Sequence, residues 1–266
     1  MKTLKFALMC VAVLALVACE KKTETTCPEC GEDPCICDEG GSTYVQLIDV
    51  ADGSLADWDN VPAEYLAIAT LPENNVYPGL KSLKVYADAM YINLAVEYDT
   101  EEITDLSWPG FHVYINTDNS ATTGYKSSQW SDASFDILLE TAVFASGEPR
   151  NYDPALFWWW GEAGSDDWNG WYDPAVGEPS ADNKWGAVVG EDDGAGIGVS
   201  QLVGNVFEIQ LSKELLSTPA PWASDEFTLA VDIQQSWTTA GALPAVTLDE
   251  AGASVSQNSL TVKFNK

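Results

Sequence analysis

Apolar and polar residues alternate with a period of two along much of this chain. The alternating stretches are 90–97, 111–116, 135–140, 207–211, 227–234 and 260–264. In the second stretch, for example, Phe111 and Val113 would face one side and His112 the other. One apolar and one polar face per strand is typical of antiparallel sheets packed across a shared core. Clusters of Gly, Pro, Asn and Asp separate the stretches, as turns between strands require.

Helical periodicity is almost absent, apart from a single turn near 212–216. We therefore predict an all-β fold, an antiparallel jelly-roll β-sandwich that forms one domain over residues 44–266. The composition agrees with a substantial core, because 46% of the residues are hydrophobic and eleven are tryptophans. A disordered chain would have far fewer large apolar side chains.

The first nineteen residues have the pattern of a secretion signal. Lys2 and Lys5 precede an apolar run over 6–17 that is too short for a transmembrane helix. The run ends in Leu-Val-Ala-Cys19, which resembles the lipobox of bacterial lipoproteins. The resemblance implies that residues 1–18 are a signal peptide and that Cys19 carries diacylglycerol on its thiol and an acyl chain, such as palmitate, on its amine.

We therefore expect a lipid-anchored protein of the outer membrane, on the cell surface rather than the periplasmic side. An ordinary secretory signal with an incidental Cys19 is the alternative. Residues 19–43 are polar and cysteine-rich, and we interpret them as a flexible linker between the lipid and the folded domain.

Four cysteines of this linker lie close together: Cys27, Cys30, Cys35 and Cys37. The sequence Cys-Pro-x-Cys-Gly is similar to the metal-binding turn of zinc ribbons. The second pair, however, follows after only four residues, closer than zinc ribbons place it. An oxidising compartment favours disulfides among these thiols. A metal site and unpaired thiols are the alternatives.

Acidic residues dominate the charge of the chain. The formal net charge is −29, and it becomes −31 once Lys2 and Lys5 leave with the signal peptide. Such a charge repels nucleic acid and anionic lipid, so we expect no nucleic-acid partner and membrane contact through the lipid anchor alone. The chain has a single histidine, which excludes multi-histidine metal sites and leaves carboxylates as the groups on which catalysis would rest.

Several short motifs follow one another in an order that resembles the family 9-like carbohydrate-binding domains. They are Ile48–Gly53 with Asp57-Trp58, the hairpin 83–97, the strand and turn 111–125, and the strands 135–137 and 206–211. The resemblance covers roughly Asp49 to Leu211. It implies a jelly-roll sandwich that binds sugars, often at chain ends, through aromatic side chains, with structural calcium in some members. The binding aromatics of that family lie in variable loops, so the resemblance predicts a type of site and not its members.

The strongest candidate site is the stretch 157–173, which holds five tryptophans among Gly, Asp and Asn. Trp158 and Trp160 would share one face of a strand and Trp159 the other, so at least one ring leaves the core. Indole rings pack on the C–H faces of sugars, while neighbouring carboxylates and amides bond the hydroxyls. The predicted carbohydrate-binding residues are Trp159, Trp168, Trp171, Tyr172, Asp167 and Asn169.

Four further tryptophans are expected to be structural rather than ligand-binding. Trp130, Trp185 and Trp237 fit the core better than a ligand contact, and Trp58 is structural by the pattern of the family. Core filling is also the alternative for the rings of 157–173, because large aromatic side chains are more often buried than exposed.

Asn116, Asp118 and Asn119 have an oxygen-rich spacing that suggests a calcium site. They lack the full ligand set of a known calcium loop. A turn whose Asn and Asp side chains bond their own backbone explains them equally well. Calcium is the one cofactor that the sequence suggests, and it stays one of two alternatives here.

The leading functional interpretation is a lipid-anchored glycan-binding protein, with outer-membrane transporters or glycosidases as its partners and no enzymatic activity of its own. A structural or adhesive surface lipoprotein is the main alternative. A glycoside hydrolase would need two carboxylates at a fixed spacing, and no pair stands out among 41 acidic residues. A haem-binding domain would need axial ligands, for which Met90 and His112 are the usual residue types. His112 is polar-facing in its strand, which favours a solvated or hydrogen-bonded side chain.

Overall fold

The computed structural model describes residues 44–132, 134–161, 171–172, 184–192 and 194–266, of which 45–266 belong to one compact unit. Cys19 and the linker cysteines Cys27, Cys30, Cys35 and Cys37 lie outside the described residues, so lipidation and the state of these thiols stay predictions. No helix among the described residues is both long and apolar enough to cross a membrane.

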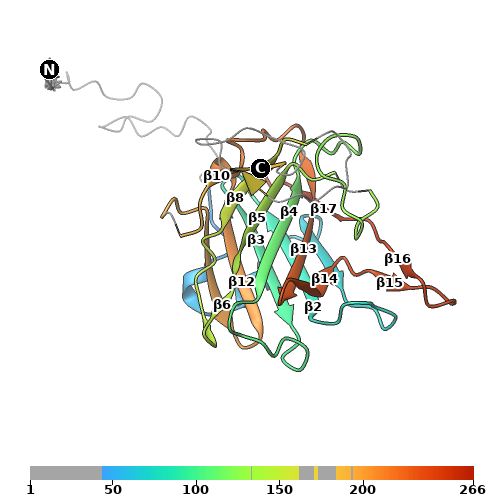
Figure 1. Ribbon diagram of the computed structural model, residues 1–266. Helices are drawn as coiled ribbons and strands as arrows, with labels where there is room; N and C mark the ends of the chain where they lie inside the picture. Colours follow the sequence, from blue (N-terminus) through green and yellow to red (C-terminus); the bar gives the residue numbers. More distant parts are fainter. Residues whose placement is uncertain (1–43, 133, 162–170, 173–183, 193) are drawn as a thin grey trace, which may run out of the picture. The chain divides into compact units, whose positions relative to one another are not determined.

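Two sheets make up the described part of the domain (Figure 1). The five-stranded sheet runs in the order β1 (Leu66–Thr70), β2 (Leu80–Ala87), β3 (Tyr91–Tyr98), β12 (Val206–Ser212) and β11 (Gly198–Val203). The eight-stranded sheet runs in the order β14 (Thr238–Leu243), β13 (Glu226–Gln235), β4 (Gly110–Asn116), β5 (Ile137–Ala142), β8 (Ala155–Trp159), β10 (Trp185–Val189) and β9 (Trp171–Tyr172), with β17 (Leu260–Lys263) paired to β13. All pairs are antiparallel except β9 with β10.

Short elements complete the described chain. Two small hairpins join β6 (Phe144–Ala145) to β7 (Glu148–Pro149) and β15 (Thr247–Leu248) to β16 (Ser254–Val255). The helical segments are η1 (Val50–Asp52), η2 (Ala56–Asn60) and α1 (Lys213–Leu216). The single turn predicted near 212–216 is α1, whose first turn is capped by the Ser212 side chain accepting from the backbone N–H of Leu215.

Two of the crossings between the sheets are related by strand pairing. Strand β4 is the next strand after β3 along the chain, but it lies in the other sheet. In the same way, β13 is the next strand after β12 and lies in the other sheet. Strand β12 pairs with β3, and β13 pairs with β4. This nested antiparallel pairing is the wrap of a jelly roll, and it confirms the predicted all-β sandwich.

The core lies between the inner faces of the sheets. It includes Phe111, Val113 and Ile115 of β4, the apolar positions of the predicted alternation. The five-stranded sheet contributes side chains such as Leu94 and Ile209, both fully buried. The period-two pattern therefore predicted correctly which side of each of these strands is internal.

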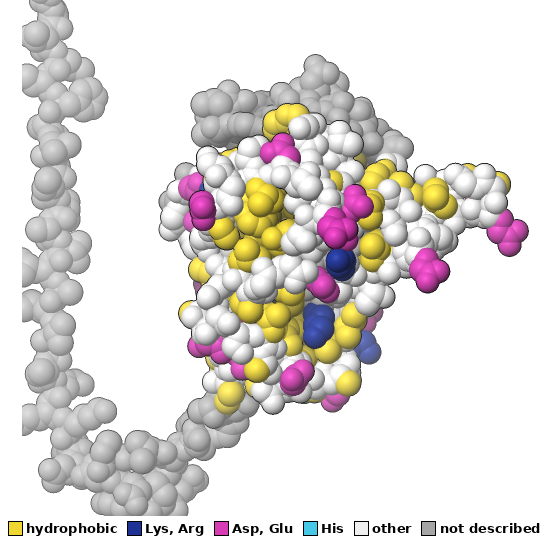
Figure 2. Space-filling model, turned by 90° about the horizontal axis from the view of Figure 1, so that it is seen from below, with side chains coloured by type: hydrophobic (Ala, Val, Ile, Leu, Met, Phe, Trp, Pro, Cys, Tyr) yellow, Lys and Arg dark blue, Asp and Glu magenta, His cyan; other side chains and the backbone are white. Residues whose placement is uncertain are grey.

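The outer faces of the two sheets are covered differently. Residues 48–61 lie over the five-stranded sheet, where Ile48, Val50 and Trp58 pack on Tyr86 and Ala95. Over the eight-stranded sheet, an aromatic cluster covers one part of the outer face; its rings are Tyr114, Tyr125, Trp130, Phe135, Phe157, Trp159 and Trp185. On the face drawn in Figure 2, Asp and Glu side chains are spread around apolar patches rather than gathered in one place, as expected of a solvated acidic surface.

Candidate functional site

A row of three charged side chains crosses the outer face of the eight-stranded sheet beside the aromatic cluster. The strand register places Asp232 of β13 directly opposite His112 of β4, and His112 opposite Glu140 of β5. The His112 Nδ1 atom lies 2.5 Å from Asp232 Oδ1, and Nε2 lies 3.7 Å from Glu140 Oε2. His112 and Asp232 are buried, whereas a third of the Glu140 side chain is exposed.

The environment of His112 favours its charged form. Burial by itself lowers the pKa of the imidazole, but the charge and hydrogen bond of Asp232, together with Glu140, outweigh burial and raise this pKa from 6.5 to about 10. The imidazolium is therefore present at neutral pH, and both ring nitrogens carry protons. One N–H is taken by Asp232, and the other is directed toward Glu140 at the surface.

Two adjoining hollows open over this row, and both are lined by His112, Glu140, Gln234 and Trp237. We call them together the His112 groove. Their volumes are about 220 and 490 Å³, within the range of small-ligand sites. Two register positions further along, on the same face of the sheet, Gly110 pairs with Ala142; both have almost no side chain, which leaves room above the sheet.

Trp237 stands at the tip of the β13–β14 hairpin beside the groove, with 89% of its side chain exposed. Its φ is +65° and that of Ser236 is +50°, so both central residues of the turn are left-handed. Two-residue hairpin turns of this kind strongly favour Asn-Gly, and other residues there cost about 1 kcal/mol or more each. The chain thus holds a large aromatic ring in solvent on a strained backbone.

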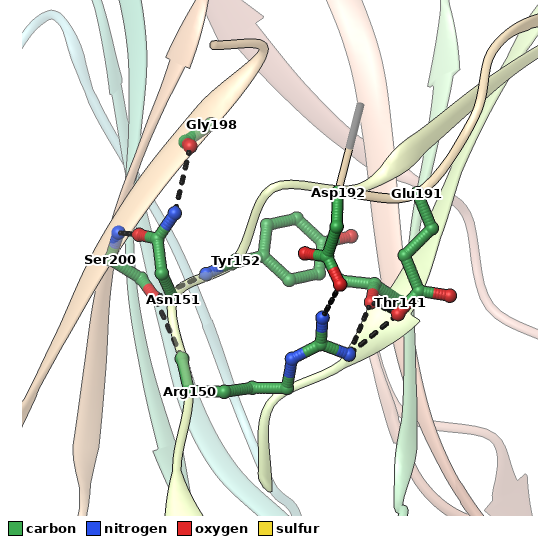
Figure 3. Close-up of polar contacts among 8 residues, drawn as sticks. All are labelled: Thr141, Arg150, Asn151, Tyr152, Glu191, Asp192, Gly198 and Ser200. Carbon is green, nitrogen blue, oxygen red and sulfur yellow. Dashed lines mark hydrogen bonds and ion pairs between the residues drawn. The ribbon is translucent and has the colours of Figure 1, made fainter. Parts of the chain in front are cut away.

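Trp108 lines the smaller hollow from the loop that precedes β4, and it is 51% exposed. The Arg150 guanidinium lies over its ring, 4.6 Å from the centroid. Arg150 donates to Glu191, to Asp192 and to the Thr141 hydroxyl, which donates in turn to Glu191 (Figure 3). Because Arg150 occupies one face of the indole, this network fixes the orientation of Trp108 beside the hollow.

The groove combines ring surfaces with hydrogen-bonding groups of both kinds. His112 and the amide of Gln234 can donate, while Glu140, Glu191 and Asp105 accept. Exposed indole faces together with paired donors and acceptors are suited to a ligand with apolar faces and hydroxyl edges. No three His, Cys, Asp or Glu side chains of the described residues stand in a ready-made metal-binding arrangement.

The residues of 157–173 that the structure describes are placed differently from the predicted site. Trp159 is 9% exposed and packs edge-on against Trp185, 5.0 Å between ring centroids, within the aromatic cluster. Little of its ring is open to a ligand. Trp160 is exposed instead and contacts Trp158. The alternation of these three rings is confirmed, with Trp159 on the aromatic-cluster side.

The other predicted carbohydrate contacts are not tested by the structure. Trp168, Asp167 and Asn169 lie outside the described residues. Trp171 and Tyr172 form β9 next to β10, and their side chains are outside the description. A binding role for this stretch stays a prediction.

At Asn116 and Asp118 the predicted calcium turn shows the local hydrogen bonds of its alternative interpretation, whereas Asn119 bonds a distant strand. Asp118 accepts from the Ser120 N–H and the Thr123 hydroxyl. The amide groups of Asn116 and Asn119 donate to the carbonyls of Ser120 and Glu226. Calcium at Asn116, Asp118 and Asn119 remains a prediction that these contacts do not require.

Several other expectations are decided by burial and position. Trp130 and Trp185 are fully buried, as expected, and Trp58 is buried at 3% exposure. The expectation that Trp237 belongs to the core was wrong, because it occupies a hairpin tip.

His112 is hydrogen-bonded, one of the two expected states. Met90 lies in the turn between β2 and β3, so the two candidate haem ligands belong to different sheets.

Two residues of the groove were missed by sequence reasoning: Trp108 and Trp237 as exposed rings. A usable clue existed for each. Trp237 follows an alternating run that ends near 235, and Trp108 precedes Pro-Gly just before the strand 110–116, so both occupy turn positions where side chains are exposed.

Comparisons with protein-family models, curated proteins and solved structures find no significant match.

Proposed function

We propose that this protein binds glycans in the His112 groove while the lipid on Cys19 holds it at the outer membrane. The observation that carries the proposal is Trp237, an almost fully exposed indole that a strained hairpin turn holds beside a polar groove. Strain of this kind is concentrated at binding sites, where it is part of the function. Trp108 supplies a second exposed ring to the same groove.

The chemistry of the groove is that of a sugar site. The faces of a pyranose ring carry C–H groups, which pack on Trp237 or Trp108. Adjacent hydroxyls both donate and accept, so the His112 N–H and the Glu140 carboxylate can bind two neighbouring hydroxyls at once. Hydrogen bonds to charged groups contribute about 1.5–3 kcal/mol each, enough to select hydroxyl geometry.

The charge of the groove favours glycans without acidic groups. Asp105, Glu140 and Glu191 line the smaller hollow, and His112 is the one cationic side chain among the described residues that line it. The nearby Arg150 is already paired with Glu191 and Asp192. Uronic-acid or sulfated glycans would therefore be repelled, as would nucleic acid. Partners such as outer-membrane transporters or glycosidases would receive the captured glycan.

The test is a glycan array probed with the full chain and with variants of each candidate site. In Trp237→Ala and Trp108→Ala we expect affinity for the bound glycan to fall at least about tenfold, as for central aromatic contacts. The variant pair Trp168→Ala and Trp171→Ala examines the stretch 157–173 in the same way. If Trp168→Ala and Trp171→Ala keep their glycan binding, the result supports the His112 groove as the binding site.

Each other outcome has a distinct meaning. Loss of binding only in Trp168→Ala or Trp171→Ala would move the site to 157–173 and leave glycan binding in place. Absence of binding to any glycan would overturn the proposed function and leave a structural or adhesive lipoprotein as the better interpretation. Stronger binding to acidic glycans than to neutral ones would contradict the charge argument alone.

A further inference from the structure

Strands β1 and β11 form the two edges of the five-stranded sheet. An edge strand presents a row of unpaired backbone N–H and C=O groups, and a strand of another chain can pair with them. Proteins usually block such an edge with charged side chains, with proline or with a covering segment. The two edges of this sheet differ, because β11 is blocked and β1 is open among the described residues.

The edge at β11 is blocked by the side chain of Asn151 (Figure 3). The Ser200 N–H donates to Asn151 Oδ1 at 2.8 Å, and Asn151 Nδ2 donates to the Gly198 carbonyl at 3.5 Å. The amide of Asn151 thus takes the place of the C=O and N–H of a neighbouring strand. The Tyr152 N–H donates to the Ser200 hydroxyl at 2.8 Å and holds this covering segment against β11.

The edge at β1 has no such cover among the described residues. The Leu71 N–H donates to the carbonyl of Lys81, directly before the register in which β1 pairs with β2. Bonded pairs recur at every second residue of an antiparallel ladder, so Ala69 and Ala67 bond β2 as well. The other residues of the strand direct their N–H and C=O groups away from β2, where no described residue bonds them; they are Leu66, Ile68 and Thr70. The strand contains no charged residue and no proline.

A groove of about 620 Å³ lies beside this open edge. Ile68 and Thr70 line it from β1, and residues 256–261 line it from the segment that leads into β17. All the described lining residues are uncharged, although the chain has a formal net charge of −29. Ile68 itself is 50% exposed. Depletion of charge is typical of the central part of a protein–protein interface. We call the outward side of β1 together with this groove the β1 edge surface.

The hairpin β15–β16 adds to the same surface. It stands clear of both sheets (Figure 1), and Thr247 at its base lines the groove. Its strands are uncharged, and Leu248 and Val255 on them are exposed. A stable interface buries about 1,200–2,000 Å² in total, more than the pairing of two short strands supplies. The groove and the hairpin offer the additional area.

We propose that a second copy of this chain pairs with β1, so that two five-stranded sheets join edge to edge. In an antiparallel pair centred on a twofold axis, Ile68 lies opposite Ile68 of the second copy, and Leu66 lies opposite Thr70. The outward residues are spaced symmetrically about Ile68, so every outward N–H and C=O group of one copy has a partner on the other. The two exposed isoleucines cover each other across the axis.

Charge and the blocked edge both favour a second copy as the occupant. Copies with a strongly negative charge repel each other wherever acidic side chains meet, and the β1 edge surface is a face where they do not meet. In the dimer the outer edges of the joined sheet are the two β11 strands, which Asn151 blocks, so the sheet closes at two copies and cannot extend into a fibre. The β1 edge surface shares no lining residue with the His112 groove, so this dimer does not depend on the proposed glycan binding.

The test is sedimentation equilibrium of the full chain at concentrations from about 1 μM to about 1 mM, which span binding free energies of about −8 to −4 kcal/mol. We expect a monomer–dimer equilibrium. Ile68→Lys places like charges opposite each other on the axis and should raise the dimer Kd at least about tenfold. Val199→Lys is the matched control, because Val199 is exposed to a similar degree, 47%, on the blocked edge strand β11, and its Kd should stay that of the parent.

A second variant separates pairing from folding. Ile68→Pro removes an N–H that does not bond β2, so the edge strand should tolerate it and the circular dichroism spectrum should stay unchanged, while the dimer weakens. Three results would overturn the proposal. They are a monomer at every concentration, a dimer that persists in both Ile68→Lys and Ile68→Pro, and a dimer that only Val199→Lys weakens. Growth of the parent beyond two copies would contradict closure at the β11 edges.

Discussion

The outer faces of the two sheets carry similar residues, but the chain covers one face and leaves the other open. Each carries a buried carboxylate on an interior strand, Asp232 on one sheet and Glu208 on the other, and each carboxylate bonds a ring N–H. On the five-stranded sheet the chain covers its own face with residues 48–61, and Trp58 is buried. On the eight-stranded sheet the face beside the aromatic cluster stays open, and Trp237 points into solvent.

The difference separates a buried, structural tryptophan from the exposed one that we propose to contact the ligand. Trp58 gains stability through burial and its bond to Glu208, whereas Trp237 costs stability through its backbone strain and its exposure. The carboxylates differ in the same sense. Asp232 has a cationic partner, whereas the partner of Glu208 is neutral and its second oxygen has no hydrogen-bond partner among the described residues.

The largest expected contrast is between Trp58→Ala and Trp237→Ala. Trp58→Ala removes a buried ring and the donor to Glu208, so the free energy of unfolding should fall by about 3–5 kcal/mol. Trp237→Ala should leave it within about 0.5 kcal/mol of the parent, because the ring contacts little. Urea unfolding followed by circular dichroism measures both. Similar losses in the two variants would erase the distinction between the faces.

A smaller effect is expected from Asp232→Asn. It removes the counter-charge of a buried imidazolium, and the free energy of unfolding should fall by about 3 kcal/mol at neutral pH. Asp105→Asn, at the exposed rim of the same groove, is the matched control and should change the free energy by less than about 0.5 kcal/mol. Chemical denaturation measures the free energy of unfolding of both variants. Equal losses would show that the buried pair of His112 and Asp232 stabilises the fold no more than an exposed carboxylate does.

The ionisation of His112 predicts a pH dependence on the open face. Its folded pKa, about 10, lies above the unfolded value of 6.5, so the stabilisation is fully present below pH 6.5 and is lost as the pH rises toward and through 10. The stability advantage of the parent over His112→Gln should therefore be larger at pH 6 than at pH 10. The chain has one histidine, so its NMR signals are unambiguous and should stay those of an imidazolium at pH 8. A midpoint near 6.5 would contradict the ion cluster.

The smallest effect has the opposite sign. The double change Ser236→Asn and Trp237→Gly installs residues that accept the left-handed turn, and the free energy of unfolding should rise by about 1 kcal/mol. Glycan affinity should fall in the same variant, since the exposed ring is gone. Tm and array binding measured together test this. A loss of stability would mean that the present turn is not strained.

The sequence allowed the general fold to be predicted because side-chain alternation is a local property of each strand. The stretches 111–116, 207–211 and 227–234 became β4, β12 and β13, with the predicted side of β4 facing the core. Short strands such as β9 and β15 were not foreseen, because two residues carry too little pattern to be detected. The groove was not foreseen either, since Asp232, His112 and Glu140 are distant in sequence and meet only through strand register.

By itself, the sequence determined the all-β class, the polarity of the central strands and the strong acidity of the surface, since each depends only on composition and local order. The tertiary structure decided which tryptophans are buried and which are displayed. It paired the single histidine with Asp232, and it placed Glu208 beneath Trp58. These relations depend on pairing between strands more than a hundred residues apart, which local patterns do not encode.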